Sequence, residues 1–312
     1  MKHQPNSASS RMIGRPLPGY VVVTMSTVLK IATFNIQYSL GADSVYDLAR
    51  CIDAVRDADV ICLQEIDRNW QRTNMADQAA EVEALLPDRY CVFSPILDVD
   101  ASSVDASGRV TNRRRQAGQM IISRFPIASS RFVELPKIDT GDMPNSWCGM
   151  HEAVIVLPDS AVRVVNVHLT DVTRSGRMVQ VREFVRRLHD APIEGGAWNG
   201  TDPDAESRAH WQLDDNKPPM PYAAVVAGDF NDIPTSPVYE TMCRSGFRDS
   251  WSPDTAITPC DVTFKTNPPQ GTFEDMRIDF IFVNDAVEVI DAVIDGECPA
   301  SDHQPVWATV KL

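Results

Sequence analysis

A strand that runs straight into a cluster of polar residues decides the fold: Ala223-Ala224-Val225-Val226-Ala227 is followed at once by Gly228-Asp229-Phe230-Asn231-Asp232. A short, continuous apolar run of this kind is typical of a strand buried inside a protein. Asp229 and Asn231 lie two residues apart, so both side chains project to the same side if the strand persists. Taken alone, the polar stretch also fits a tight turn, because Asp and Asn favour turns.

Polar residues interrupt or end apolar segments at five other places in the chain. These are Thr33-Phe34-Asn35-Ile36-Gln37, Leu63-Gln64-Glu65-Ile66-Asp67, Asn166-Val167-His168-Leu169-Thr170, Arg277-Ile278-Asp279-Phe280-Ile281 and Ser301-Asp302-His303-Gln304-Pro305. In layered α/β folds the ends of the strands line the functional site. Each stretch has a plain structural explanation by itself, but the set predicts that these polar side chains meet in one site.

Apolar runs and helical periodicities alternate from Leu29 to the end of the chain. Strands are predicted over Leu29–Asn35, Val60–Leu63, Tyr90–Phe93, Gln119–Ser123, Phe132–Leu135, Ala153–Leu157, Val162–His168, Ala223–Ala227, Ile278–Val283, Val287–Ile294 and Pro305–Lys311. Helices are predicted from a cap at Asp43, and over Gln78–Leu86, Ser175–His189 and Ser236–Gly246. No internal repeat is visible, and nothing divides the chain into two domains.

The composition is that of a soluble globular protein. Of the residues, 43% are hydrophobic and 23% are charged, which excludes a disordered or fibrous chain. No stretch approaches the roughly 18 uninterrupted apolar residues of a membrane span. The net charge of −14 argues against a polybasic surface for membranes or nucleic acid. It does not exclude nucleic acid, because a bound cation can supply positive charge where it is needed.

The length of 312 residues fits one layered domain. Residues 1–24 are rich in Ser, Pro, Gly and Arg. We expect them to be a disordered tail, or to result from a start codon assigned too far upstream. Residues 25–312 are then a single domain with a long insertion at 191–222. The seven cysteines are odd in number and form no C-x-x-C pair. They predict reduced thiols in a cytoplasmic protein rather than a disulfide framework or a zinc site.

The polar set is chemically suited to a hard cation. Carboxylate and amide oxygens are the ligands that Mg²⁺ and Mn²⁺ prefer in proteins. The sequence has no helix with two histidines four residues apart, no G-x-S-x-G and no P-loop. It therefore predicts chemistry assisted by Mg²⁺ or Mn²⁺.

In their order along the chain, these stretches resemble the endonuclease/exonuclease/phosphatase superfamily, the DNase I-like metal-dependent phosphoesterases. The resemblance runs from about Leu29 to Leu312. It includes Gly118-Gln119-Met120-Ile121-Ile122-Ser123-Arg124-Phe125-Pro126-Ile127, which is similar to a central strand of the family. It implies an α/β fold, a four-layer α/β sandwich with two mostly antiparallel central sheets flanked by helices.

The resemblance also implies roles for individual residues. Those expected to hold or assist the metal are Asn35, Glu65 and Asp302. Those expected to be catalytic are His168, Asp229, Asn231, Asp279 and His303. By this resemblance Asp229 belongs to the region that positions the attacking water, and Asp279 orients His303. His168 and Asn231 contact the phosphate oxygens, and His303 either contacts the phosphate or transfers protons. Which of Asp229 and His303 is the general base stays open.

We expect a Mg²⁺- or Mn²⁺-dependent hydrolase of a phosphoester in a small molecule or lipid head group. His168 stands where abasic-site endonucleases typically have Tyr, and His151-Glu152 stands where DNase I-like nucleases often have Arg. A DNA or RNA nuclease is therefore the alternative, and nucleic acid is not the favoured partner. A non-catalytic binding protein on this scaffold is a second alternative, which the complete set of polar residues opposes. No obligate protein partner can be read from the sequence.

Three further residues are candidates for substrate contacts. Arg115 belongs to the only dense basic run, Arg113-Arg114-Arg115, which is either a solvated loop or a phosphate grip at the rim of the site. Trp198 and Trp211 belong to the insertion. They either contact an apolar part of the substrate or anchor the segment to the body of the protein. Because the insertion separates the helix after His168 from the strand of Asp229, we expect it to set substrate choice.

Overall fold

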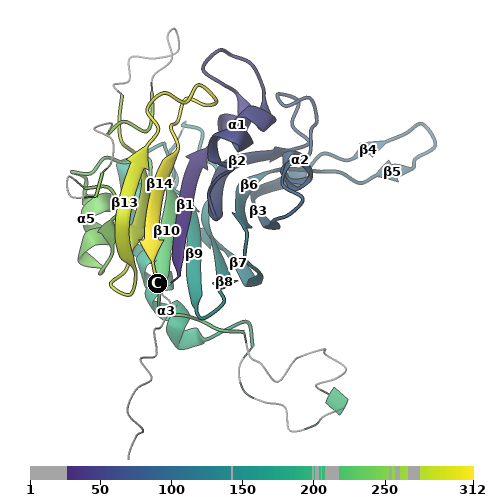
Figure 1. Cartoon of the computed structure of the whole chain (residues 1–312). Coiled ribbons are helices and arrows are strands. Elements are labelled where there is room, and N and C mark those ends of the chain that lie inside the picture. The colour runs from purple at the N-terminus through teal and green to yellow at the C-terminus, as the bar shows by residue number, and fades with distance from the viewer. Residues whose placement is uncertain are drawn as a thin grey trace, which may run out of the picture.

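The computed structural model describes residues 27–141, 143–198, 200, 204, 206–207, 218–252, 255–256, 261–265 and 275–312. The predicted tail at residues 1–24, Trp211 and much of the predicted insertion lie outside these residues. Two six-stranded sheets pack against each other, with helices on their outer faces (Figure 1). The chain therefore has the predicted α/β sandwich fold.

The first sheet is ordered β13-β14-β1-β2-β6-β3. Its strands are β1 (Val28–Asn35), β2 (Val60–Arg68), β3 (Tyr90–Asp100), β6 (Arg114–Ser123), β13 (Glu288–Ile294) and β14 (Val306–Lys311). The second sheet is ordered β11-β12-β10-β9-β8-β7. Its strands are β7 (Ile127–Leu135), β8 (Cys148–Val156), β9 (Ala161–His168), β10 (Ala224–Asp229), β11 (Arg248–Asp249) and β12 (Asp279–Val283).

Most neighbouring strands are antiparallel, but each sheet contains one parallel pair. In the first sheet β1 runs parallel to β2, and in the second β9 runs parallel to β10. A parallel pair needs a crossover, which α1 (Leu48–Val55) and α3 (Arg174–Glu194) supply. The carboxyl ends of both strands of a pair then meet at one edge, so each pair delivers two strand ends to the same place.

Apolar side chains gather in three clusters that correspond to the three contacts between four layers. One cluster lies between the sheets and contains residues such as Ile31, Val164 and Ile281. A second joins the first sheet to α1 and α2 (Gln78–Leu85). A third joins the second sheet to α3 and α5 (Pro237–Arg244). In the part of the chain that the structure describes, no helix is long and apolar enough to cross a membrane.

The first helix begins later than the sequence predicts. Asp47 is its cap, and the Asp47 carboxylate accepts a hydrogen bond from the Arg50 backbone N–H at 3.0 Å. Asp43 instead accepts the backbone N–H of Val45 and forms an ion pair with Arg50. The residues between them form a turn, because Asp43 satisfies its side chain locally rather than at a helix start.

Strands β3 and β6 are also longer than predicted and continue beyond the body of the sheet as an arm. The arm ends in the short pair β4 (Ser103–Val104) and β5 (Val110–Thr111), which projects from the molecule (Figure 1). Arg114 and Arg115 lie in the β3–β6 ladder, opposite Asp100 and Val99, and not in a loop. Backbone pairing keeps this polar stretch extended, although the apolar pattern from which strands are predicted ends earlier.

A layer of buried polar side chains lies between the sheets. Gln64 donates to Thr33 Oγ1 at 3.0 Å and to Asn166 Oδ1 at 2.7 Å. His151 is paired in register with Asn166, and it is fully buried. Neither ring nitrogen of His151 has a hydrogen-bond partner among the described residues. Burial disfavours the imidazolium and lowers the pKa of His151 from its ordinary 6.5 to about 4.

This buried imidazole predicts a loss of stability in acid. The folded protein keeps His151 neutral down to about pH 4, whereas the unfolded chain takes up a proton below about pH 6.5. The stabilisation is thus complete above pH 6.5, and it falls by about 1.4 kcal/mol per pH unit between these limits. His151→Gln should remove this dependence, so the difference in unfolding free energy between the two proteins should change with that slope. Parallel curves in denaturant titrations from pH 4 to 8 would contradict it.

Candidate active site

A break in strand β2 turns Glu65 toward the cleft. The β2–β6 register shifts between Leu63 and Ile66, and Glu65 has a φ of 62°. A bulge of this kind re-aims one side chain out of the regular alternation. The backbone carbonyl of Leu63 beside the bulge accepts a hydrogen bond from Asn166 Nδ2 at 2.8 Å. A residue of the second sheet thus holds the bulge that presents Glu65.

The second parallel pair brings Asp229 and His168 together. They are register partners at the carboxyl ends of β10 and β9, and His168 Nε2 lies 3.5 Å from Asp229 Oδ2. Asn231 follows with a φ of 52°, and its backbone N–H donates to Asp229 Oδ1 at 2.8 Å. Its side-chain amide donates to the carbonyl of Leu169 at 2.9 Å. The stretch after β10 is therefore a turn built around the Asp229 carboxylate.

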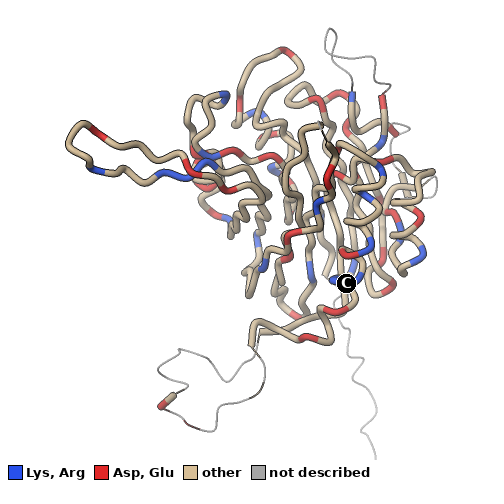
Figure 2. The backbone as a smooth tube through the Cα atoms, turned by 180° about the vertical axis from the view of Figure 1, so that it is seen from behind, with Lys and Arg blue, Asp and Glu red and all other residues tan. Residues whose placement is uncertain are grey.

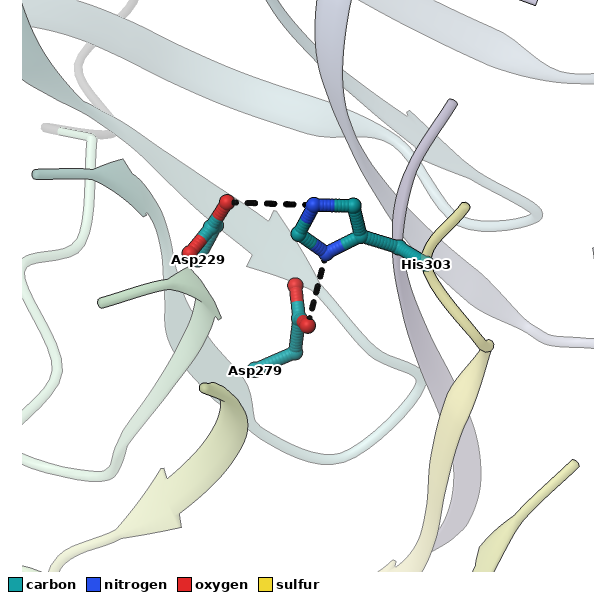
Figure 3. Close-up of side chains that lie close together, drawn as sticks. All are labelled: Asp229, Asp279 and His303. Carbon is teal, nitrogen blue, oxygen red and sulfur yellow. Dashed lines mark hydrogen bonds and ion pairs between the residues drawn. The ribbon is translucent and has the colours of Figure 1, made fainter. Parts of the chain in front are cut away.

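His303 connects two buried aspartates (Figure 3). Its Nδ1 lies 2.9 Å from Asp279 Oδ2, and its Nε2 lies 3.8 Å from Asp229 Oδ2. Asp279 begins β12 and is the register partner of Asp229, so one strand pair delivers both carboxylates. The three groups are close enough to share a cation. His303 thus lies between two carboxylates, one on the side of each ring nitrogen, and this arrangement is suited to proton transfer.

The charges in this cluster shift one another's pKa values. Burial disfavours the His303 imidazolium, but Asp279 and Asp229 outweigh this effect and raise the pKa of His303 to about 10. Burial raises the pKa of Asp229, and the neighbouring charge of Asp279 raises it further, against the opposing effect of His303. At neutral pH the arrangement holds a charged imidazolium beside a carboxylate of increased basicity.

Asn35 occupies the centre of the site, but its amide oxygen faces away from it. Its Nδ2 donates to Glu65 Oε1 at 3.1 Å and to Asp229 Oδ2 at 3.0 Å. Its Oδ1 accepts the backbone N–H of Gln37 at 3.0 Å. A metal needs the oxygen of an amide, so Asn35 as placed supports the carboxylates rather than ligating a cation.

Glu65 and Asp302 are the two expected metal ligands whose carboxylates line the cavity. The charge of Glu65 adds to the effect of burial in raising the pKa of Asp302. Gln37 Nε2 donates to Asp302 Oδ2 at 2.7 Å and holds it in place. Two carboxylates that repel each other in a half-buried space form an oxygen donor set that suits a small hard cation. The residues present therefore fit Mg²⁺ or Mn²⁺.

These side chains surround one cavity of about 800 Å³ at the carboxyl ends of both parallel pairs. Its lining includes Glu65, His168, Asp229, Asn231, Asp302 and His303. Asn35 and Asp279 are buried and hydrogen-bonded to these groups rather than exposed in the cavity. All eight residues that the sequence places in the metal and catalytic sets thus lie at one end of the sandwich.

Comparisons with known proteins agree with this architecture. The model of the Endonuclease/Exonuclease/phosphatase family matches residues 32–303. The chain belongs to this family. A search of curated proteins finds no match.

Among solved structures, this family member is similar to the endonuclease/exonuclease/phosphatase from Bacteroides vulgatus. The identity is 23%, the match covers 92% of this chain and 99% of that one, and the TM-score is 0.64. A mannosyl-6-phosphatase of Bacteroides thetaiotaomicron is 18% identical, with coverages of 90% and 99% and a TM-score of 0.57. A 3′ phosphatase from Neisseria, bound to a product DNA hairpin, is 18% identical, with coverages of 90% and 98% and a TM-score of 0.54. These identities show a common fold.

Two of the three candidate substrate contacts, Arg115 and Trp198, do not line the cavity of this family member. Arg115 Cζ lies 5.5 Å from the ring centre of Trp70, which does line the cavity. Trp198 is half-buried beyond the end of α3. Trp211 lies outside the described residues, and its expected role stays a prediction.

The parallel crossover decides where the two described ends of the insertion lie, whereas its expected role in substrate choice stays a prediction. Helix α3 begins just after His168 at the cleft and returns over 21 residues, about 30 Å, to the start of β10. The segment that follows it therefore leaves from the opposite end of the sandwich.

Several residues of the site lie outside the sets that the sequence analysis assigned to it. Gln37 binds Asp302, and Arg72, which lines the cavity, forms a two-bond ion pair with the buried Asp67 carboxylate. On the other side Arg177 and Arg174 both contact Asp232. Gln37 carried a signal, because it stands two residues after Asn35 at a strand end. The pair of Arg72 and Asp67 depends on how the chain after β2 folds back, and no spacing in the sequence indicates it.

The Asp279–His303 contact should behave as one functional unit in this family member. Asp279→Asn leaves the size of the side chain unchanged but removes the charge that orients and stabilises the imidazolium. We expect each of Asp279→Asn and His303→Ala to lower kcat by about 100-fold or more. The double variant should fall far short of the product of the two effects, because the second change acts on a pair already broken. Multiplicative losses in a double-mutant cycle of kcat would contradict the pairing.

Proposed function

We propose that this protein is a Mg²⁺- or Mn²⁺-dependent hydrolase of phosphoesters, acting on a small molecule or a lipid head group. The single observation that carries the proposal is the position of Asp229. Its carboxylate lies between His303, His168 and Asn35, opposite Glu65, within a cavity of about 800 Å³. A proton acceptor (Asp229), a charged hydrogen-bond donor (His303) and a carboxylate suited to a metal (Glu65) thus surround the cavity. Its volume is that of a small-molecule site.

Glu65 and Asp302 would hold the divalent cation. When bound, the cation supplies Lewis-acid stabilisation of charge on the phosphoryl and leaving oxygens. Asn35 donates its amide hydrogens to both Glu65 and Asp229. It therefore fixes the distance between the proposed metal ligand and the proposed proton acceptor. Gln37 fixes Asp302 by a hydrogen bond at 2.7 Å.

Asp229 is the group best suited to accept the proton of the attacking water. Burial and the charge of Asp279 raise its pKa, which increases its basicity near neutral pH. His303 then acts as a charged donor to a phosphoryl oxygen, because its neighbours raise its pKa to about 10. His168 and Asn231 line the same cavity and donate to the other phosphoryl oxygens as negative charge develops.

The distribution of charge supports a small substrate over a polymer. Figure 2 shows Lys and Arg interspersed with Asp and Glu over the side that it presents. Of the run Arg113–Arg115, Arg114 is paired with Asp98, and Arg115 contacts Trp70. A long nucleic acid gains most of its non-specific affinity from many free phosphate contacts. The named neighbours include a sugar phosphatase and an enzyme bound to DNA, so they do not choose between the two classes.

Removing the charge of Glu65, an expected metal ligand, should greatly lower activity. Glu65→Gln replaces a carboxylate by an amide of equal size, and we expect a loss of about 100-fold or more in kcat with an unchanged melting temperature. Glu288→Gln, which alters an exposed carboxylate on β13, is the matched control and should keep full activity. The assay is a panel of phosphoesters that includes bis-p-nitrophenyl phosphate, sphingomyelin, nucleotides and DNA, with Mg²⁺ or Mn²⁺. Hydrolysis that survives EDTA would refute the metal mechanism.

Salt dependence separates the small substrate from the nuclease alternative. With few phosphate contacts, kcat/KM for the best substrate should change by less than about tenfold between roughly 50 and 200 mM salt. A nuclease that makes 6 to 10 backbone contacts would lose about 10³- to 10⁵-fold in affinity over that range. Efficient cleavage of plasmid or RNA with such a steep slope would promote the nuclease.

A further inference from the structure

Two tryptophans line the cavity without a place in the chemistry described so far. Trp70 follows β2, and Trp147 directly precedes β8. Trp147 is 41% exposed, an unusual position for a large apolar side chain at the mouth of a polar site. Trp70 and Trp147 therefore need an explanation that the catalytic set does not give.

Trp70 is held rigidly in the cavity wall. Its Nε1 donates to the carbonyl of Gln116 at 2.7 Å. The Arg72 guanidinium carbon lies 4.7 Å from the Trp70 ring centre and 3.8 Å from that of Tyr38. Arg72 is itself fixed by two hydrogen bonds to Asp67, whose carboxylate is fully buried. The ring is thus oriented in advance, which lowers the entropy that a ligand must overcome on stacking against it.

Both tryptophans are tied to the same stretch of β6. Trp70 is bonded to Gln116, and Trp147 stands two residues before Gly149, whose carbonyl accepts the Gln119 side-chain amide at 3.3 Å. Between these anchor points Ala117 and Gly118 line the cavity with almost no side chain. Trp70, Trp147, Ala117 and Gly118 all line the cavity, and we call this part of its wall the apolar recess.

This recess lies beside Glu65. The residue after Glu65, Ile66, is the register partner of Gly118, which places the metal-type carboxylate next to the floor of the recess. In an in-line displacement the leaving group departs opposite to the attacking water. The proposed function assigns the water to Asp229, so the leaving group points away from it, past Glu65 and toward Trp70 and Trp147.

We propose that Trp70 and Trp147 form a leaving-group subsite that selects phosphoesters whose leaving group carries a planar aromatic ring. The inference rests on the proposed function, because the direction of the leaving group follows from the role of Asp229. Stacking of one ring on tryptophan contributes about tenfold in affinity. Phenols and nucleosides both offer such a ring, and comparing the kcat/KM of phenyl phosphate with that of nucleoside monophosphates separates the two sources.

Phenylphosphonate and methylphosphonate test the subsite by binding alone, since neither can be hydrolysed. In the presence of Mg²⁺, calorimetry on the full chain should give a Kd about tenfold lower for phenylphosphonate. Trp147→Ala should remove this advantage and leave the Kd of methylphosphonate unchanged. Trp147→Phe, which keeps a ring, should restore most of it. Trp198→Ala, at the far end of the molecule, is the matched control and should keep the full preference.

The outcomes separate this inference from the proposed function. If the protein hydrolyses phosphoesters but binds both phosphonates equally, the subsite is refuted and the function stands. If Trp147→Ala weakens both phosphonates by the same factor, Trp147 supports the fold of the cavity rather than recognising a ring, and the subsite is again refuted. If neither phosphonate binds and no phosphoester is hydrolysed with Mg²⁺ or Mn²⁺, both proposals fail together.

Discussion

The two hydrogen bonds donated by the Asn35 side-chain amide are the contact on which the cleft depends. They join Glu65 of the first sheet to Asp229 of the second. Without donors between them, two carboxylates brought together in a buried space would repel each other and resist desolvation. The amide offsets part of this cost and sets the separation of the sheets at the cleft. Its oxygen is turned to the Gln37 backbone, which fixes the direction of both donors.

The remainder of the architecture can be understood as the means of holding that contact in place. Each sheet contributes one parallel pair, so two crossovers bring four strand ends to one edge of the sandwich. The apolar cluster between the sheets keeps their faces in register. The Gln64–Asn166–Leu63 hydrogen bonds cross the same interface just below the cleft and hold the bulge at Glu65. A shift of one sheet relative to the other would therefore move all the reactive groups at once.

The sequence indicated the strand ends well because their signal is local. Asp229, His168 and Glu65 each follow an apolar run long enough to be a buried strand, and the order of the stretches pointed to the fold. The sequence could not give the direction in which Asn35 turns its amide, because that depends on carboxylates far away in the chain. It also could not place Trp70 and Arg72, whose positions follow from Asp67 and from the β2–β6 ladder.

The two ends of the segment at 191–222 do not lie where adjacency in the sequence suggested, and the reason is physical. Adjacency in sequence to the helix after His168 and the strand of Asp229 suggested that the segment lies near the cleft. A parallel crossover returns the chain to the opposite end of the sheet before the next strand begins. Helix α3 ends at Glu194, so the segment leaves from the end where β10 starts rather than where it finishes.

The two sides of that segment come together at its base. A side chain at Gly196 would meet the backbone oxygen of Pro218 at 2.1 Å, so the chain leaves and returns through almost one point. Loops whose ends nearly touch accept foreign domains and new termini with little cost to the host fold. A reporter or a second enzyme spliced between these residues would sit a helix length from the reacting groups. The fold thus offers an insertion point for a further domain, and helix α3 separates that point from the candidate active site.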